Sequence, residues 1–326
     1  MRNKRYILGI DTSNYTTSVA IADASGTIRA DCRRLLTVKK GERGLRQSEA
    51  LFQHINNLPD LIGDAFRYAE HREICAVAVS ARPRPIEGSY MPVFKAGMSV
   101  AYSIAKVLKV PVYEFSHQEG HIEAVKTTGG FQTAGGFLAY HLSGGTCELL
   151  DVRERVCGFR IETIGGSLDL SYGQLLDRVG VSLGMEFPAG AALDALAVAT
   201  DVPIGTRLKP IPHNGTYVNL SGIETQCQRA LTPGENNAAL VKELFERIAV
   251  SLEKTVWATA EQTGCRDILF VGGVSGSEYI KNKLQENLRK KGMQPVFADA
   301  RLAQDNAVGI AFLGGKAYEA DQGFSA

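Results

Sequence analysis

The sequence lacks the features that mark membrane, secreted and disulfide-bonded proteins. No apolar run reaches the roughly 18 residues that cross a bilayer, and the apolar segment 6–10 is interrupted by Asp11 before it could serve as the core of a signal peptide. The six cysteines contain no Cys-x-x-Cys spacing, which argues against a zinc ribbon or a disulfide scaffold. We therefore expect a cytoplasmic protein whose cysteines are mostly reduced core residues.

An excess of charge of one sign is also absent, because 36 Lys and Arg nearly balance 35 Asp and Glu. Global charge thus indicates no nucleic-acid partner, and any such partner must use a local patch. The chain is long, however. Its 326 residues exceed the usual size of one hydrophobic core, and its 44% apolar and 22% charged residues are those of a globular protein. Two similar lobes are the expected organisation.

Two hairpins with polar tips recur about 130 residues apart. The tip of the first begins with Asp11-Thr12-Ser13, and the tip of the second is Ser143-Gly144-Gly145-Thr146. The expected strands that flank these tips are 6–10, 18–22, 137–142 and 147–152. This repetition predicts duplicated lobes.

Strands alternate with helices along the rest of the chain, which favours parallel pairing. Apolar spacing predicts helices at 48–69, 94–108, 170–183, 236–263, 277–291 and 305–319. Buried strands are expected at 74–80, 110–115, 268–271 and 295–298, and a loop at 203–212. The predicted lobes are 1–130 and 131–326, with the last helix able to pack back on the first.

The hairpin tips offer groups that can bind phosphate. Glycines permit close backbone approach and concave sets of N–H groups for anions, as in the turn at Ser143, Gly144 and Gly145. A strand that ends in Gly272-Gly273 before a helix suits a flat adenine and its ribose. Each element alone is also typical of an ordinary turn, but their combination favours an ATP or adenylate site.

Two of the six histidines lie in His117-Gln118-Glu119-Gly120-His121. If a helix starts here, the i, i+4 spacing puts both imidazoles on one face, where they can hold a divalent metal. A chance pair of surface histidines is the alternative. His141, on the strand before the second tip, is by itself typical of a buried core histidine. Asp305 opens the predicted last helix, where an N-cap role is common for Asp.

Taken together, the histidine pair, Ser-Gly-Gly, Gly-Gly-Val-Ser and Asp-Asn-Ala resemble the tRNA threonylcarbamoyladenosine transferase family, once called O-sialoglycoprotein endopeptidases, over nearly the whole chain. The resemblance implies an α/β, two-lobed actin/hexokinase-like ATPase fold with duplicated ribonuclease-H-like lobes. It implies His117, His121 and Asp305 as metal ligands, and iron and zinc suit this donor set equally. Archaeal members carry a tyrosine where this chain has His141, which makes His141 a candidate fourth ligand.

The same resemblance assigns Asp177 to the ribose hydroxyls, with Gly190 beside it, and Ser277 to the place of the asparagine that follows Gly-Gly-Val-Ser-x. Other positions depart from the family pattern. The first loop, Glu-Thr-Ser-Cys-Asp-Glu-Thr in the family, has lost two acidic residues here. A Gly-Pro-Gly loop is replaced by Arg82-Pro83-Arg84, and Thr146 follows Ser-Gly-Gly. Much of the active site thus differs, as in a divergent paralogue.

The activity that the resemblance implies is transfer of a threonylcarbamoyl group from threonylcarbamoyl-AMP to N6 of the adenosine next to the anticodon of tRNA. The metal would act as a Lewis acid, Thr12 and Ser13 would stabilise the departing phosphate, and Asp11 would transfer protons. One alternative is a carbamoyltransferase that acts on a small molecule. Another is a nucleotide-binding regulatory or complex subunit without chemistry. No Ser-His-Asp order or His-Glu-x-x-His helix supports proteolysis.

The implied partners are tRNA and other proteins of the threonylcarbamoylation pathway. A tRNA would need a local basic surface, and charge runs are more often solvated faces. The two candidate stretches are Arg29, Arg33, Arg34, Lys39, Lys40, Arg43 and Arg46, and Lys281, Lys283, Arg289, Lys290 and Lys291.

Overall fold

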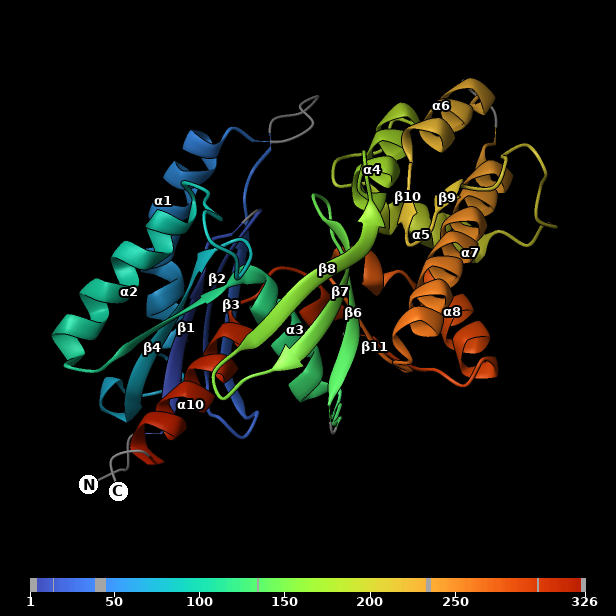
Figure 1. The fold of residues 1–326 in the computed structure, drawn as a ribbon. Helices are drawn as coiled ribbons and strands as arrows, with labels where there is room; N and C mark the ends of the chain where they lie inside the picture. The colour runs from blue at the N-terminus through green and yellow to red at the C-terminus, as the bar shows by residue number, and fades with distance from the viewer. Residues whose placement is uncertain are drawn as a thin grey trace. The chain divides into compact units, whose positions relative to one another are not determined.

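The computed structural model describes residues 5–13, 15–38, 45–133, 135–232, 236–297 and 299–323. The chain forms two compact units, each assembled from segments that are separated in sequence (Figure 1). The first contains Met1–Gln132, Arg153–Arg160 and Gln304–Ala326, and the second contains Thr133–Val152 and Ile161–Ala303. No helix within the described residues is long and apolar enough to cross a membrane.

The sheet of the first unit has five strands in the order β3-β2-β1-β4-β5. They are β1 Tyr6–Asp11, β2 Thr16–Ala22, β3 Ile28–Leu35, β4 Ile74–Arg82 and β5 Val112–Ser116. Strand β1 pairs antiparallel with β2 and parallel with β4, and β4 pairs parallel with β5. The first predicted hairpin and the parallel pairing are therefore confirmed.

The last helix packs tightly in the first unit, against β1, β4 and α3. Glycines permit this approach: a Cβ on Gly9 would meet the carbonyl oxygen of Ala307 at 2.5 Å, and a Cβ on Gly309 would overlap the carbonyl oxygen of Gly120. Backbones thus touch where α3 and α10 meet. The helices of this unit are α1 Gln47–Ala65, η1 His71–Glu73, α2 Phe94–Leu108, α3 His117–Thr128 and α10 Val308–Gly323.

The sheet of the second unit repeats the strand order of the first and extends it. Its order is β12-β11-β6-β7-β8-β10-β9, in which β6 is flanked by β7 and β8 on one side and by β11 and β12 on the other. Strand β1 of the first sheet has the same surroundings, so the predicted duplication is confirmed. The strands are β6 Gly136–Leu142, β7 Cys147–Glu154, β8 Phe159–Ser167, β9 His213–Asn214, β10 Tyr217–Val218, β11 Asp267–Val271 and β12 Gln294–Phe297.

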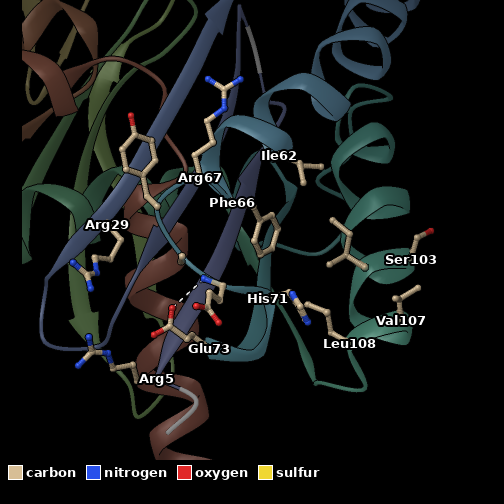
Figure 2. A pocket seen from close by; sticks show the side chains of 14 residues that line it. Arg5, Arg29, Ile62, Phe66, Arg67, His71, Glu73, Ser103, Val107 and Leu108 are labelled. Atoms are coloured by element: carbon tan, nitrogen blue, oxygen red, sulfur yellow. Dashed lines mark hydrogen bonds between the residues drawn. The ribbon is translucent and has the colours of Figure 1, made fainter. Parts of the chain in front are cut away.

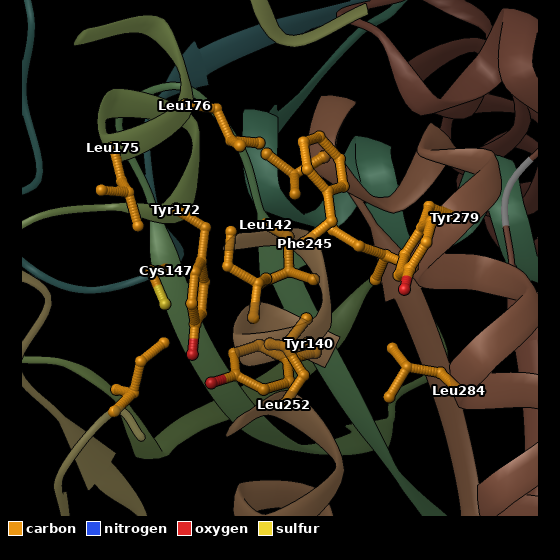
Figure 3. Close-up of a cluster of buried hydrophobic side chains, with 14 of the residues drawn as sticks. Tyr140, Leu142, Cys147, Tyr172, Leu175, Leu176, Phe245, Leu252, Tyr279 and Leu284 are labelled. Carbon is orange, nitrogen blue, oxygen red and sulfur yellow. The ribbon is translucent and has the colours of Figure 1, made fainter. Parts of the chain in front are cut away.

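The core of the second unit lies between its sheet and its helices (Figure 3). Large side chains such as Tyr140, Tyr172 and Phe245 are fully buried there. The hydroxyl of Tyr172 keeps a partner because it lies 2.9 Å from Oγ of Ser251. The helices of this unit are α4 Tyr172–Ser182, α5 Gly190–Ala199, α6 Ser221–Ala230, α7 Ala238–Thr263, η2 Gly273–Gly276, α8 Glu278–Lys290 and α9 Ala300–Ala303.

The last helix begins three residues later than its predicted N-cap. Because α10 starts at Val308, Asp305 does not cap it. Asn306 does so instead: its Oδ1 accepts hydrogen bonds from the amides of Val308 at 3.1 Å and Gly309 at 3.3 Å. The expectation that Asp305 opens this helix is wrong. Its carboxylate lies near His117 and His121 instead.

The elements not expected from the sequence include β3, β8, α5 and α6. Charged residues interrupt the apolar pattern of β3 and β8, Asp194 is the one polar side chain in the otherwise apolar α5, and α6 buries only Ile223 and Cys227. None of the four shows the periodicity that indicates a strand or a helix. The loop expected at 203–212 is confirmed, because no helix or strand lies between α5 and β9.

The first unit also has a hollow of about 1150 Å³ between the ends of α1 and α2 and the start of β1 (Figure 2). Arginines Arg5, Arg29 and Arg67 and the apolar side chains of Phe66 and Leu108 line it. Of the residues that line it, Arg29 belongs to the first predicted basic stretch, and none belongs to the predicted metal or nucleotide sites.

Candidate metal centre and nucleotide-binding elements

The helix predicted at the histidine pair exists and begins at His117. Ser116 caps it: Oγ of Ser116 accepts from the amide of Glu119 at 3.2 Å, while the carboxylate of Glu119 accepts from the amide of Ser116 at 2.8 Å. This capping box fixes where the helix starts. His117 and His121 consequently fall on one face, with ring centroids 4.4 Å apart.

Asp305 joins the two imidazoles in the first unit. The Nε2 atoms of His117 and His121 lie 3.0 Å apart, and Oδ1 of Asp305 lies 3.4 Å from the first and 3.3 Å from the second. Ligand atoms that surround one cation at about 2.0–2.2 Å are separated by comparable distances. These three residues therefore fit a divalent metal.

Burial and the carboxylates set the charges in this cluster. Burial disfavours the imidazolium of His117, but the carboxylates of Asp11 and Asp305 outweigh it and raise the pKa of His117 to about 10. Burial and the charge of His117 lower the pKa of His121. Burial raises the pKa of Asp305, yet hydrogen bonds and charge from both histidines hold it well below its usual range. A cation at this point would replace the proton of His117.

Asp11 and Ser13 both contact His117. Oδ1 of Asp11 is 3.2 Å from Nδ1 of His117, and Oγ of Ser13 donates to Oδ2 of Asp11 at 2.7 Å. Ser13 also lies 3.3 Å from Nε2 of His117, which gives the connectivity of a Ser-His-Asp triad. Ser13 is only 3% exposed and donates its hydroxyl hydrogen bond to Asp11, so this arrangement does not present a nucleophile.

Thr12 is buried, and the backbone occupies its hydroxyl. Its Oγ1 donates to the carbonyl oxygen of Val93 at 3.0 Å and accepts from the amide of Gly97 at 3.2 Å. These bonds tie the end of β1 to the start of α2. The predicted contact of Thr12 with phosphate stays a prediction.

The second hairpin tip forms the expected turn. It is closed by a hydrogen bond of 2.8 Å from the amide of Ser143 to the carbonyl oxygen of Thr146, and the Oγ of Ser143 accepts from the amides of Gly145 and Thr146. Gly144 and Gly145 are exposed. The first turn of α4 lies against this tip, because a Cβ on Gly173 would meet the carbonyl oxygen of Ser143 at 2.6 Å. The positive end of a helix dipole thus lies beside the tip, as suits an anion.

Gly272-Gly273, the predicted adenosine motif, lies beside this tip in the second unit. Gly272 has a φ of 90°, and a Cβ there would lie 2.5 Å from the carbonyl oxygen of Leu142, the residue before Ser143. Gly273 opens the 3-10 turn η2 directly after it. Two elements predicted to bind nucleotide, which are about 130 residues apart in sequence, therefore adjoin.

Asp177 faces the start of α5. Its Oδ1 accepts a hydrogen bond from the amide of Ala189 at 2.8 Å, next to Gly190. Burial raises the pKa of Asp177, and the amides of Ala189 and Gly190 oppose that shift. The carboxylate and Gly190 are thus brought together, as the ribose assignment requires.

Asp194 was missed by the sequence reasoning. Its carboxylate accepts from Oγ of Ser277 at 2.6 Å and from the amides of Glu278 and Tyr279 at 2.7 and 3.2 Å. The sequence signal that could have indicated Asp194 is its spacing of four residues from Gly190, which places the two residues on one side of α5. Ser277, assigned to the nucleotide, is the N-cap of α8.

His141 lies on β6, is 4% exposed, and has its Cδ2 atom 3.1 Å from the position of a Cβ on Gly272. It thus borders the adenosine motif of its own unit. Its predicted part as a fourth metal ligand stays a prediction.

Much of the charge in the predicted basic stretches is paired with acidic residues. Arg33 and Arg34 contact Asp31 and Asp60 in the first stretch. In the second, Lys283, Lys290 and Lys291 contact Glu246, Glu286 and Glu253. Lys39, Lys40 and Arg43 lie outside the described residues. The paired groups offer less net charge to a polyanion than the sequence suggests.

Similar solved structures identify the fold. The chain matches component A of the (R)-2-hydroxyglutaryl-CoA dehydratase of Acidaminococcus fermentans with a TM-score of 0.56 and 14% identity, over 97% of this chain and 99% of that one. A ROK family glucokinase from Streptomyces griseus matches with a TM-score of 0.53 and 14% identity, over 95% and 99% of the two chains. The fold is an α/β, actin/hexokinase-like ATPase fold of two ribonuclease-H-like lobes, as predicted.

Sequence comparison narrows this class to a family. Residues 36–312 match the family model described as tRNA N6-adenosine threonylcarbamoyltransferase. Curated proteins of that name from Thermotoga neapolitana and Thermus thermophilus are 28% and 29% identical to this chain. Each match covers 94% of this chain, and 93% and 91% of those proteins. The chain belongs to the tRNA N6-adenosine threonylcarbamoyltransferase family.

Proposed function

We propose that this protein is an acyltransferase that moves a threonylcarbamoyl group from threonylcarbamoyl-AMP to N6 of the adenosine next to the anticodon of tRNA. The observation that carries the proposal is the cluster of His117, His121 and Asp305 in a chain of this family. The cluster is made of residues 184 positions apart, and its donor atoms converge within 4.8 Å. Such convergence supports a ligand set more than a chance pair of histidines.

In this proposal, His117, His121 and Asp305 hold one divalent metal, iron or zinc. When bound, the metal would supply Lewis-acid polarisation of the carbamoyl oxygen. The N6 amine of adenine is a poor nucleophile, so the remaining residues would act mainly by holding the two substrates in place.

The second unit would bind the adenylate part of the donor. Asp177 would accept hydrogen bonds from the ribose hydroxyls, and Gly272-Gly273 would lie against the adenosine. The tip at Ser143-Gly144-Gly145, with the positive end of α4 beside it, would face the phosphate. ATP would bind the same elements because it shares the adenylate group.

The test is a transfer assay with the purified protein, ATP, threonine, bicarbonate, the separate adenylate synthase and unmodified tRNA. Nucleosides from the digested tRNA are identified by mass spectrometry, and metal content is measured on the same preparation. We expect one divalent metal per chain and formation of threonylcarbamoyl-adenosine that depends on the protein and is lost in His121→Ala. His71→Ala, which changes an exposed histidine outside the cluster, is the matched control.

Other outcomes would contradict the proposal. Turnover of a small acceptor without RNA would favour a carbamoyltransferase of another kind. Nucleotide binding without any transfer would favour a regulatory or complex-forming subunit. In either case His121→Ala still reports separately on metal binding.

A further inference from the structure

Three neighbouring strands of the first sheet end at the candidate metal centre. Asp11 is the last residue of β1, Ser80 lies near the end of β4, and His117 follows β5 directly. The three strands are parallel and adjacent, and Ile10 pairs with Val79 just before Asp11 and Ser80. Strand register therefore places Asp11 beside Ser80 and both beside the start of α3.

Asp11 is completely enclosed by these residues. Its Oδ1 accepts a short hydrogen bond from Oγ of Ser80 and lies 3.2 Å from Nδ1 of His117. Its Oδ2 accepts from Oγ of Ser13 at 2.7 Å. The side chain has no exposed surface. Both carboxylate oxygens are therefore committed to groups of the protein itself.

The contact with His117 decides which imidazole nitrogen can bind a metal. A carboxylate beside Nδ1 accepts a hydrogen bond from the N–H of that nitrogen, which leaves the lone pair of a neutral ring on Nε2. Nε2 is the atom that faces His121 and Asp305. A ring with its proton on Nε2 would instead turn a donor toward the ligand set.

We infer that Asp11 and Ser80 are positioning residues: Ser80 holds the Asp11 carboxylate, and Asp11 fixes the orientation and donor nitrogen of His117 as a metal ligand. This inference rests on the metal centre proposed above and assigns Asp11 a task other than proton transfer. The Asp11 carboxylate has no exposed surface, and both of its oxygens contact Ser80, Ser13 or His117, so it is not presented to a substrate atom. Ser80 belongs to none of the motifs that suggested the site.

The inference is tested on zinc affinity, measured by competition with a chelator, in the wild type, Asp11→Ala and Ser80→Ala. Loss of a residue that orients a histidine ligand typically weakens metal affinity by about 10–100-fold. We expect a loss of that size in Asp11→Ala and a smaller loss in Ser80→Ala, where the carboxylate stays but loses one of its supports. Ser251→Ala removes a matched buried serine of the second unit, bonded to Tyr172, and should leave zinc affinity unchanged.

A second readout separates positioning from general stability. In zinc-loaded protein labelled with ¹⁵N-histidine, we expect the proton of His117 on Nδ1 in the wild type, and a displaced Nδ1 resonance in both variants. The resonances of His71 should not move. Because Ser80→Ala removes only one hydroxyl, it keeps the test open if Asp11→Ala does not fold.

The outcomes for this inference and for the metal centre differ. If the wild type binds no zinc, or if His121→Ala binds it equally well, the metal centre itself is refuted. If the wild type binds zinc through His121 but Asp11→Ala and Ser80→Ala match its affinity and its His117 resonances, only the positioning role is refuted.

Discussion

The hydroxyl of Ser277 donates a hydrogen bond of 2.6 Å to the carboxylate of Asp194 and accepts one of 3.2 Å from the amide of Ile280. The two residues are 83 positions apart and join the start of α8 to α5. Asp194 also accepts from the amides of Glu278 and Tyr279. The Asp194 carboxylate thereby caps the N-terminus of α8, the helix that follows the predicted adenosine motif.

The first prediction concerns this carboxylate. Asp194→Ala leaves the Ser277 hydroxyl and two amides without their charged acceptor, so we expect the second unit to lose about 1–3 kcal/mol of stability. Trp257, the one tryptophan of the chain, lies on α7 of this unit, and its fluorescence in urea measures the loss. Asp201→Ala, an exposed aspartate of the same unit, should change little. Equal stability of the two variants would show that the network is dispensable.

A second prediction concerns nucleotide binding by Asp177. Saturation with a ligand at 100 times its Kd stabilises a protein by about 2.7 kcal/mol, so millimolar ATP with metal should raise the melting temperature of the wild type. Asp177→Ala removes the acceptor for the ribose hydroxyls, and its increment on adding ATP should shrink or vanish. The rise in melting temperature on adding ATP is compared, rather than the melting temperature itself, because the mutation also removes the hydrogen bond from Ala189 and so changes the stability without ATP. The same increment in both proteins would exclude Asp177 from the nucleotide site.

The third prediction is that His141 is a fourth metal ligand. A neutral imidazole binds iron or zinc readily, whereas a tyrosine must first lose a proton of pKa near 10. Because a tyrosine that has lost this proton can also coordinate, His141→Tyr should keep the metal, and the change of donor atom should alter the optical spectrum of the cobalt-loaded protein. An unchanged spectrum, together with unchanged affinity in His141→Ala, would identify a core histidine beside Gly272 instead.

The fourth prediction concerns acid stability. Burial raises the pKa of Asp169, but hydrogen bonds from the amides of Leu220, Ser221 and Leu170 hold it well below its ordinary 3.8. A carboxylate whose pKa is lower in the folded state than in the unfolded state stabilises the fold at pH values above its unfolded-state pKa. This contribution is lost as the pH falls through its folded-state pKa. The stability difference between wild type and Asp169→Asn, followed by Trp257 fluorescence, should be full at pH 7 and decline below about pH 4. A difference independent of pH would argue against this charge effect.

Features with a local signature were predictable from the sequence. Both hairpins and the helix at His117 follow from apolar alternation, turn residues and a spacing of four. The metal cluster could not be predicted from local sequence. Asp305 lies beside His121 because α10 packs on α3, where Gly309 contacts Gly120. Family resemblance supplied that connection.

Partners that depend on strand order could not be predicted in this way. Ser80 contacts Asp11 because β4 is the neighbour of β1, and nothing near Ser80 in the sequence distinguishes it from other strand ends. Asp194 and Ser277 meet through the packing of two helices. The capping of α10 was misassigned because Asp305 and Asn306 are adjacent and both are favourable N-cap residues.

The span between His121 and Asp305 has a consequence for synthesis of the protein. A ribosome that adds about 5–20 residues per second needs roughly 10–40 s to pass from one residue to the other. During that interval the histidine pair can form on α3, but its carboxylate and the helix α10 that packs on β1 and β4 do not yet exist. The nascent chain therefore has an incomplete ligand set for most of its translation. If His117, His121 and Asp305 hold a metal as proposed, selective loading would have to follow translation, because a metal captured earlier would be held by two ligands and readily exchanged.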